Sequence, residues 1–489
     1  DDLDDARGNM TLDFGFAPAP MITHFKMLSG ITQTGHNAYT VTYTVEVRNN
    51  GAAGTYHLYD TPNFENNITI TGGSYTSNFV GGPSGSFTPP YNGTQNQLAN
   101  NVSIGLGAIH TYTVSFNVTI DMLAANTFPT FDTYTACGGG VGGPPAAGQG
   151  LFNMSQLDRN ADGSVEEERV ACGDLPYITH EKLGPAISTL QPDGSYNVTY
   201  TIRVYNAGGA SGNYDLSDTP YFDDDITINT ASYSTTGVVP GVVGGALSLN
   251  NGVLNALAND QSIAAGSNHT YTLVYNVTLD LNPTSTDGGN NTYTSCGTVS
   301  TAPGPLAPGS TVTTRMGLYN TSALDTNNDA NPDEEDERCG DLPFLTLAKT
   351  FVSAVPGAAA GAHTVTYTIT VMNTGGATTT YDLRDVPGFD DDIAIASASY
   401  TAVGAGTLPP VVLAGSGPWL LADNASIAAG VTHTYTLTVN VLLDLSAGSS
   451  GNNSYTACGT TQGSTSPIPG EGLHNRANLD MHNDGTPDS

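Results

Sequence analysis

The sequence predicts an all-β protein made of three tandem immunoglobulin-like β-sandwich modules. One strand pattern, in which apolar residues alternate with Thr and other polar residues before an Asn-containing turn, occurs three times, at residues 39–51, 196–209 and 363–376. The composition is rich in Gly, Thr, Asn and Ser, and only 12% of residues are charged. Each copy is embedded in a series of short strands separated by Gly, Pro and Asn turns, which is typical of a sandwich. Repetition at this scale indicates tandem domains.

In the first module, which contains the first copy of this pattern, the expected strands follow one another at short intervals. They are residues 22–28, 39–48, 55–60, 67–76, 110–120 and 131–137. We expect the following division of the chain: 1–18, the tail of a preceding β module with a strand at 10–16; 19–137, module one; 138–176, a calcium-loop junction; 177–296, module two; 297–343, a second junction; 344–458, module three; and 459–489, a truncated third junction.

The charge of the chain limits its partners. There are 45 acidic against 12 basic residues, a net charge of −33, which argues against nucleic acid or an anionic membrane surface and suits cations. No apolar run is long enough to span a bilayer, so we expect no membrane insertion in this segment. Five cysteines at recurring positions favour an oxidising compartment, and the chain opens on DDLDD, so we expect a mature or excised piece of a secreted protein.

Three acidic loops have oxygen ligands at alternating positions, the arrangement of a calcium-binding loop. The candidate ligands are Asp158, Asn160, Asp162, Ser164 and Glu166 in the first loop; Asp325, Asn327, Asp329, Asn331, Asp333 and a closing Asp336 in the second; and Asp480, His482, Asp484, Thr486 and Asp488 in the third. Ala330 replaces the turn glycine, His482 is a poor calcium ligand, and Arg169 stands at the usual closing position, where Glu167 or Glu168 would substitute. The alternative is an acidic, solvated linker; three copies in register favour calcium as the cofactor.

A second acidic group follows the early hairpin of modules two and three. Its members are Asp218, Asp223, Asp224 and Asp225, and then Asp385, Asp390, Asp391 and Asp392. We expect a solvated loop here, with a second cation site as the alternative. Three histidines, His110, His269 and His433, open the same strand of separate modules, so they cannot converge on one metal and a strand-edge role is expected.

Three segments of module three carry a resemblance to a known family. Residues 365–376, 381–392 and 428–441 together resemble the repeat domain of large bacterial and archaeal surface proteins, domain-of-unknown-function family eleven. The opening TLDFGF, residues 11–16, resembles the end of the B domains of serine-aspartate-repeat adhesins. The resemblance covers nearly the whole chain and implies sandwich modules in stalks, adhesins or surface layers on the outside of a cell. It names no substrate.

We therefore expect a structural, extracellular surface protein, a stalk, fibre or filament subunit stiffened by calcium and disulfides. Its partners would be copies of itself or neighbouring modules of a longer chain. The alternative is an adhesin whose modules bind host or cell-surface glycan or protein. An enzyme is not expected, because no module shows a nucleophile elbow, a Cys/His pair at catalytic spacing or a phosphate loop.

The cysteines allow two pairings. We expect Cys137–Cys172 and Cys296–Cys339, which would tie the end of one module to the start of the next and leave Cys458 without a partner in this chain. The alternative, Cys172–Cys296 with Cys339–Cys458, would join the two ends of one sandwich. Those ends lie at opposite poles of an immunoglobulin-like module, beyond the ~7 Å limit on Cα separation.

The three lysines of the chain occupy the same place in the first strand of each module, and alternation turns them inward. A buried ammonium needs a partner. The candidate groups are Lys26 with Asp60 and Asp132, Lys182 with Asp218 and Asn291, and Lys349 with Asp385 and Asn453. First-strand Lys, last-strand Asn or Asp and a nearby acid resemble the self-forming isopeptide bonds of pilin and adhesin modules. The alternative is a buried Lys–Asp ion pair with a hydrogen-bonded Asn or Asp.

Overall fold

The computed structural model describes residues 19–123, 129–140, 143–238, 246–282, 289–296, 315–405, 411–413, 415–449, 451–459, 468–482 and 485–488. Its sheets group into three β-sandwiches, each made of two antiparallel sheets, and the predicted all-β fold is confirmed. The predicted tail strand at residues 10–16 lies outside the described residues. In the described part of the chain, no helix is long and apolar enough to cross a membrane.

Module one has sheets in the order β1-β2-β7-β4-β5 and β6-β3-β8-β9. Its elements are β1 Ile22–Gly35, β2 Ala38–Asn49, β3 Gly54–Pro62, β4 Ile68–Ser77, β5 Gly85–Ser86, β6 Asn96–Ile104, β7 Ile109–Ile120, the 3-10 turn η2 Cys137–Gly140, β8 Asn153–Asp158 and β9 Glu167–Ala171.

Modules two and three repeat this plan. Module two has sheets β10-β11-β15-β13 and β14-β12-β16-β17, and module three has β18-β19-β24-β21-β22 and β23-β20-β25. The strands of module two are β10 Ile178–Ile187, β11 Tyr196–Asn206, β12 Gly212–Pro220, β13 Ile226–Thr236, β14 Asn255–Ile263, β15 Asn268–Leu279, β16 Asn320–Asp325 and β17 Glu334–Arg338. Those of module three are β18 Leu345–Pro356, β19 Ala362–Asn373, β20 Thr379–Pro387, β21 Ile393–Val403, β22 Val411–Leu413, β23 Trp419–Ile427, β24 Thr432–Leu443 and β25 Asn475–Asp480.

The repeated strand that predicted the fold is an inner strand of the first sheet of each sandwich. In β2, Val41, Tyr43, Val45 and Val47 are fully buried, whereas the residues between them are only partly covered. Because successive side chains of a strand point to opposite faces, this alternation turns one apolar row toward the facing sheet. Each buried side chain of this size stabilises the fold by ~1.5–3 kcal/mol relative to an exposed one.

The expectation that residues 138–176 form a junction between modules is wrong. β8 pairs with β3, where Leu58 lies opposite Leu157, and β9 extends the same sheet. The physical reason is that β6 covers only one edge of β3, so a second strand is needed to pair its other edge. The predicted strand 131–137 forms only an isolated bridge from Phe131 to Leu123 and the turn η2.

The same correction applies to the other two expected junctions. β16 and β17, from within 297–343, complete the second sheet of module two, and β25, from within 459–489, completes that of module three. Residues 297–314 and 460–467 lie outside the described part.

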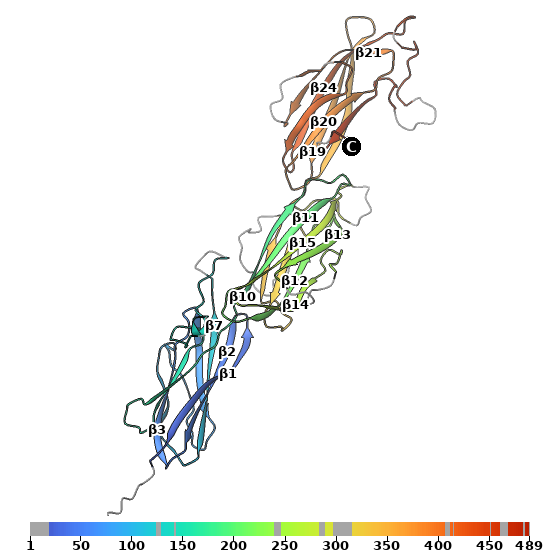
Figure 1. The fold of residues 1–489 in the computed structure, drawn as a ribbon. Helices are drawn as coiled ribbons and strands as arrows, with labels where there is room; N and C mark the ends of the chain where they lie inside the picture. Colours follow the sequence, from blue (N-terminus) through green and yellow to red (C-terminus); the bar gives the residue numbers. More distant parts are fainter. Residues whose placement is uncertain are drawn as a thin grey trace, which may run out of the picture.

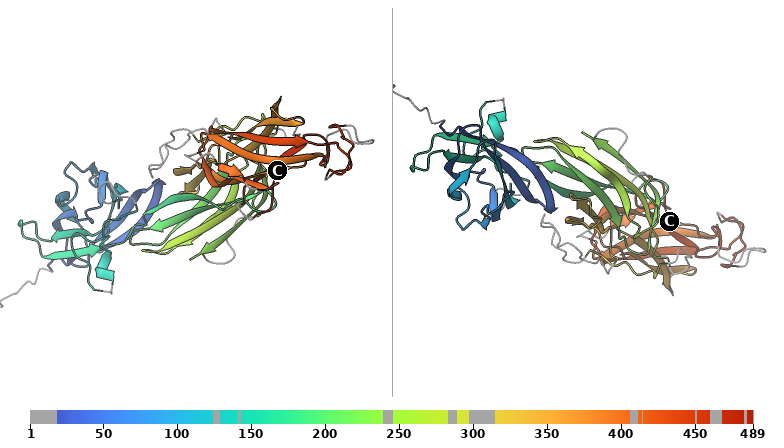
Figure 2. Two further views of the ribbon diagram at one scale, coloured as in Figure 1. Left: turned by 90° about the horizontal axis from the view of Figure 1, so that it is seen from above. Right: turned by 90° about the horizontal axis from the view of Figure 1, so that it is seen from below.

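The three sandwiches follow one another along one axis. Figure 1 shows module one, in blue, and module three, in orange and red, on opposite sides of module two. The views from above and below in Figure 2 keep this order, so module one and module three do not fold back on each other.

Candidate functional site

Each acidic loop is the turn of a hairpin or the end of a strand inside a sandwich, and all three share one hydrogen-bond pattern. The opening carboxylate accepts backbone N–H groups from inside its loop: Asp158 Oδ2 from Gly163 at 2.8 Å, and Asp325 Oδ2 from Ala330 at 3.0 Å. Its other oxygen accepts the N–H two residues on, at Asn160 and Asn327. The third loop follows the same plan, with Asp480 Oδ2 accepting from Gly485 at 2.8 Å and Asp480 Oδ1 from the N–H of His482.

A second carboxylate closes each loop eight residues after the first. Glu166 accepts the N–H of Arg159 at 2.7 Å, Asp333 accepts that of Thr326 at 2.8 Å, and Asp488 accepts that of Met481 at 2.6 Å. Ligand atoms of Asp158, Asp162 and Glu166 lie within 4.8 Å of one another, as do those of Asp480, His482 and Asp488. The first and third loops therefore each gather three potential metal ligands at one point.

The expected closing position, three residues later, is wrong for the second loop. Asp336 is buried in the sandwich, where it accepts the backbone N–H of Lys182 at 2.7 Å and faces Arg338 at 2.7 Å. Likewise Glu167 and Glu168, the expected substitutes in the first loop, contact Arg169 and Gln156. In the described parts of the loops, Asn160, Asn327, Asp329 and Asn331 make only bonds within their own loops, Ser164 donates its N–H to Asp162, and Thr486 is exposed. Asp484 lies outside the described residues.

The donor chemistry of these loops fits a hard cation. Oxygen is the ligand type that calcium prefers, and clustered carboxylates repel one another without a positive charge between them. In the third loop the fit is weaker, because His482 Nδ1 contacts Asp488 Oδ1 at 2.6 Å and occupies one carboxylate oxygen.

The second and third loops lie against the preceding module. Thr326 accepts a hydrogen bond from Gln33 of module one at 3.0 Å, and His36 Nδ1 lies 3.9 Å from Asp333. His482 Nε2 lies 2.7 Å from the carbonyl oxygen of Gln191 in module two. The acidic loops thus reach the boundary between modules, although they are not the connecting chain. In Figure 1 the C mark stands beside β19 and β20, at the end of module three that faces module two.

The connecting chain itself is short and fixed. Leu175 and Leu342 are fully buried, each in the core of the module that it leaves. Their N–H groups donate to Tyr134 Oη at 3.2 Å and to Tyr293 Oη at 2.9 Å. A Cβ at Gly208 would lie 2.4 Å from the carbonyl oxygen of Leu175, so only glycine allows the next module to approach this closely.

Both expected disulfides are present at these boundaries. Cys137–Cys172 and Cys296–Cys339 each have a Cα separation of 5.9 Å, and Cys458 is free and exposed. Asp174 and Asp341, two residues after the second cysteine of each pair, accept the N–H of Cys137 at 3.0 Å and of Cys296 at 2.8 Å.

Most of the second acidic group is buried, so the expectation of a solvated loop holds only for Asp224 and Asp391, which are exposed. Ligand atoms of Asp223, Asp224 and Asp225 lie within 4.8 Å of one another, as do those of Asp390, Asp391 and Asp392, so the alternative of a second cation site stays open. Asp223, Asp225, Asp390 and Asp392 are at most 3% exposed. Their carboxylates accept backbone N–H groups of the segment that leads to the cysteine, for example Asp225 from Asn291 at 2.8 Å and Asp392 from Asn453 at 3.0 Å. Burial raises the pKa of Asp223, and the N–H of Thr294 opposes that rise. These carboxylates therefore hold the segment before the cysteine in place, although that segment forms no strand.

The lysines point inward as predicted, and each meets the expected Asp. Lys26 pairs with Asp60, Lys182 with Asp218 and Lys349 with Asp385, and the carboxylates are fully buried. Each Nζ also lies over a tyrosine ring, 5.0–5.1 Å from the centroids of Tyr43, Tyr200 and Tyr367.

The third member of each expected lysine group lies elsewhere. Asp132 is exposed and its N–H bonds to the carbonyl oxygen of Met122, whereas Lys26 is buried. The backbone N–H groups of Asn291 and Asn453 instead donate to Asp225 and Asp392 of the second acidic group. The reason is that residues 131–137 and their counterparts do not form the last strand, so the inward parity assigned to them does not hold.

Three asparagines that the sequence reasoning missed lie beside the Lys–Asp pairs. Asn153, Asn320 and Asn475 open β8, β16 and β25, and the Oδ1 and Nδ2 atoms of all three are shielded from solvent without a hydrogen-bond partner. The pattern Asn-x-Ser/Ala-x-Leu-Asp at residues 153–158, 320–325 and 475–480 is the signal that could have found them.

The three recurring histidines are buried and hydrogen-bonded. His110, His269 and His433 each take the hydroxyl of Tyr56, Tyr214 or Tyr381 at 2.7–2.8 Å. Burial lowers the pKa of all three imidazoles, which favours the neutral ring that accepts this bond.

A buried Ser–His–Glu arrangement in module two resembles a catalytic triad only in outline. His180 Nε2 lies 3.0 Å from Ser322 Oγ, and its Nδ1 lies 3.6 Å from Glu334. Ser322 donates its proton to the carbonyl oxygen of Asp336, so the histidine is the donor to Ser322 and does not activate it. Module one repeats the arrangement with His24, Ser155 and Glu167, and module three has Leu347 and Ala477 instead. The serines are fully buried, so these groups stabilise the sandwich.

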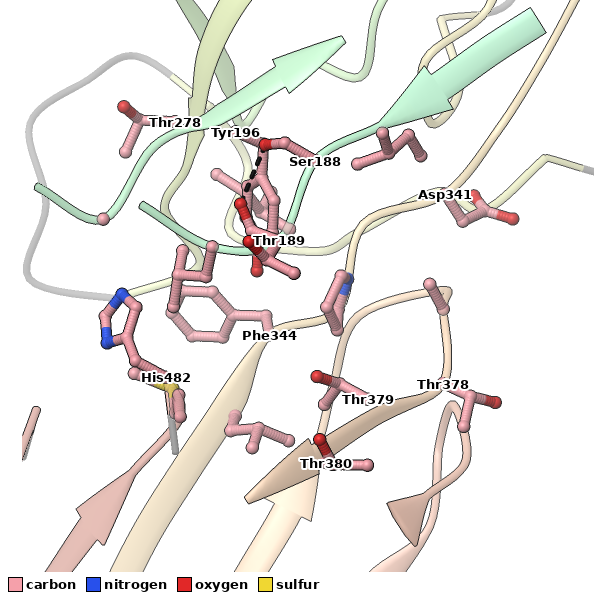
Figure 3. Close-up of a pocket in the computed structure, with 18 of the residues that line it drawn as sticks. Ser188, Thr189, Tyr196, Thr278, Asp341, Phe344, Thr378, Thr379, Thr380 and His482 are labelled. Carbon is pink, nitrogen blue, oxygen red and sulfur yellow. Dashed lines mark hydrogen bonds between the residues drawn. The ribbon is translucent and has the colours of Figure 1, made fainter. Parts of the chain in front are cut away.

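A cavity of about 680 Å³ lies between modules two and three. Figure 3 shows Thr189 and Tyr196 of module two on one side and Phe344 and His482 of module three on the other.

No family model and no curated protein matches the chain. Similar solved structures include BcpA, the major pilin subunit of Bacillus cereus, at 10% identity and a TM-score of 0.25, covering 87% of this chain and 96% of that one. The partial N-terminal region of the enterococcal surface protein has 9% identity, a TM-score of 0.19 and coverages of 64% and 92%. The exo-chitosanase CsxA of Amycolatopsis orientalis has 8% identity and a TM-score of 0.16. The match covers 67% of this chain but only 27% of that enzyme. At these TM-scores the likenesses carry no functional assignment.

Proposed function

We propose that the chain is an extracellular structural spacer, a stalk or filament segment of a cell-surface protein, and not an enzyme. The observation that carries this proposal is the pair of boundaries between modules. At each, a buried leucine, a disulfide and an acidic loop from the next module replace a free linker. A disulfide and a buried residue at the connection reduce the conformational freedom of the chain there, whereas flexible linkers of Gly and Ser permit relative motion of domains.

Calcium is part of this proposal. Asp158, Asp162 and Glu166 would hold one ion, and the oxygens of the second and third loops would hold others. The ion supplies positive charge to clustered carboxylates. The loop residues keep their backbone N–H groups bonded to the first and last acid, which positions the oxygens before an ion binds.

Electron microscopy of the native material tests the structural function. A surface layer, lattice or filaments that contain this chain are expected, because a spacer acts by its length within an assembly. Dispersed molecules that bind members of a glycan array would instead support the adhesin function.

That adhesin function is the second candidate, and the cavity between modules two and three is the observation that favours it. Phe344 and Tyr196 supply aromatic surface, and Thr189, Thr379 and Thr380 supply hydroxyls, which together suit a sugar. Binding to a glycan array that is lost in Phe344→Ala but kept in the exposed variant Phe351→Ala would establish this function.

A further inference from the structure

Each module contains the three groups needed to form an amide bond between side chains. The first is the amine of Lys26, Lys182 or Lys349, which comes from the first strand of one sheet. The second is the carboxyl group of Asp60, Asp218 or Asp385, on the facing sheet. The third is the carboxamide of Asn153, Asn320 or Asn475, on the strand next to that Asp.

The strand register brings the Asn next to the Asp. Asp60 lies opposite Ser155 and Pro62 opposite Asn153, so Asn153 is the diagonal neighbour of Asp60 on the same face. The same register relates Asp218 to Asn320 and Asp385 to Asn475. In module two, Tyr275 donates its hydroxyl to Asp218 at 2.6 Å. Burial raises the pKa of Tyr275 far above its ordinary value, and the neighbouring Asn320 amide acts in the opposite sense.

The carboxamides are unusual because they are shielded from solvent without a hydrogen bond of ordinary geometry. Asn153 and Asn320 are fully buried, and neither their N–H₂ nor their C=O group makes a hydrogen bond of ordinary geometry, although Asn320 lies close enough to Tyr275 to act on its pKa. A buried amide that lacks a good hydrogen bond destabilises the fold, and here this recurs at the same place in three modules. This repetition is expected if the carboxamide is a reactant in each module, and not if its role is to stabilise the fold by hydrogen bonding.

The electrostatics favour the reactive forms of the other two groups. Burial lowers the pKa of all three lysines, against the attraction of the carboxylate, which favours the uncharged amine. In module three, burial raises the pKa of Asp385, while Lys349 and the amide of Asn475 oppose the rise. A carboxyl group with a raised pKa can accept a proton from the amine and return it to a leaving group.

We propose that each module forms an intramolecular isopeptide bond, Lys26–Asn153, Lys182–Asn320 and Lys349–Asn475, with the intervening Asp as the proton carrier. The Nζ lone pair attacks Cγ of the Asn, and the Nζ–Cγ bond forms. The Cγ–Nδ2 bond breaks and ammonia leaves, carrying the proton that the Asp took from the amine. Atoms balance as amine plus carboxamide to substituted amide plus ammonia, and no oxidant or other reactant is needed.

The bond would carry tension around each sandwich. The lysine lies near the start of its module and the asparagine near its end, in the two facing sheets. A pulling force would pass from Lys26 to Asn153 and on to the next lysine without unfolding the strands between them. The bond thus goes beyond the spacer function, since it would exist whether or not the chain spaces anything.

Intact-mass measurement of the reduced full chain tests the proposal. The expected mass is that of the sequence less three molecules of ammonia, and digestion should yield branched peptides that join each lysine to its asparagine. A mass equal to the sequence, a loss of water in place of ammonia (which would mean Lys–Asp bonds), or branches to other residues would overturn it.

Variants of module two assign the roles, with modules one and three as internal controls for folding and chemistry. Asn320→Ala and Asp218→Ala should each retain two ammonia losses. Asn291→Ala, which changes an asparagine of the same module whose backbone N–H donates to Asp225, should retain three. Three losses in Asn320→Ala, or two in Asn291→Ala, would contradict the assignment of Asn320.

Discussion

At the residue scale, the histidine–tyrosine pairs make one prediction about pH. Burial holds the pKa of His110, His269 and His433 below the ordinary value of 6.5. At a pH between the folded and unfolded pKa values of these histidines, the unfolded chain binds more protons than the folded one. Their contribution to the free energy of unfolding is therefore fully present above about pH 6.5 and decreases as the pH falls below it.

The melting temperature should therefore fall as the pH is lowered from about 7 to about 5.5, before most carboxylates titrate. The triple variant His110→Gln, His269→Gln, His433→Gln should melt at a lower temperature at neutral pH, yet with a smaller slope over this range. An unchanged slope would show that these histidines do not contribute.

The direction of a side chain could be predicted from the sequence where the alternation of a strand decides it. The inward direction of Lys26, Lys182 and Lys349 and their pairing with Asp60, Asp218 and Asp385 follow from parity alone. Asn153 and its counterparts were not predictable in this way, because their role depends on which strand pairs with β3. That pairing is a long-range contact, which no local pattern encodes.

At the element scale, β8 gives a direct test of the sandwich boundaries. Leu157 is fully buried opposite Leu58, whereas Val170 on β9 is 38% exposed. Leu157→Ala should destabilise module one by ~2–5 kcal/mol because it leaves a cavity. Val170→Ala should change the stability by less than ~0.5 kcal/mol. Calorimetry of the full chain measures the stability change of both variants. Equal effects would contradict the assignment of β8 to the sandwich and support a linker.

The acidic loops give a second test at this scale. With calcium, loop one should resist protease; a chelator should expose the turn between β8 and β9 and lower the melting temperature. Glu166→Gln should reproduce the chelated state of loop one in the presence of calcium, since it removes one of three clustered carboxylates. Glu168→Gln, whose side chain contacts Gln156, is the matched control. Identical protease maps with and without chelator would exclude a calcium site.

The elements that sequence patterns predicted well are the long alternating strands, such as β2, β11 and β19. The short strands β8, β9, β16 and β17 were interpreted as linker, since each has five or six residues and borders an acidic loop. The same error displaced the closing ligand of the second loop from Asp333 to Asp336.

At the scale of the whole molecule, the number and order of the modules could be predicted, because the repeats are long and similar. The cysteine pairs were also predictable from the separation of the sandwich poles. The contacts across the boundaries, such as Gln33 with Thr326 and His482 with Gln191, were not, since they join residues nearly three hundred positions apart.

The central claim is that the three sandwiches form one stiff rod, and small-angle X-ray scattering of the full chain in calcium tests it most directly. We predict that a single conformation with the arrangement in Figure 1 accounts for the whole scattering curve. The longest dimension should not change with protein concentration at low concentration. A curve that requires a broad set of bent conformations in the presence of calcium and with both disulfides intact would contradict the claim.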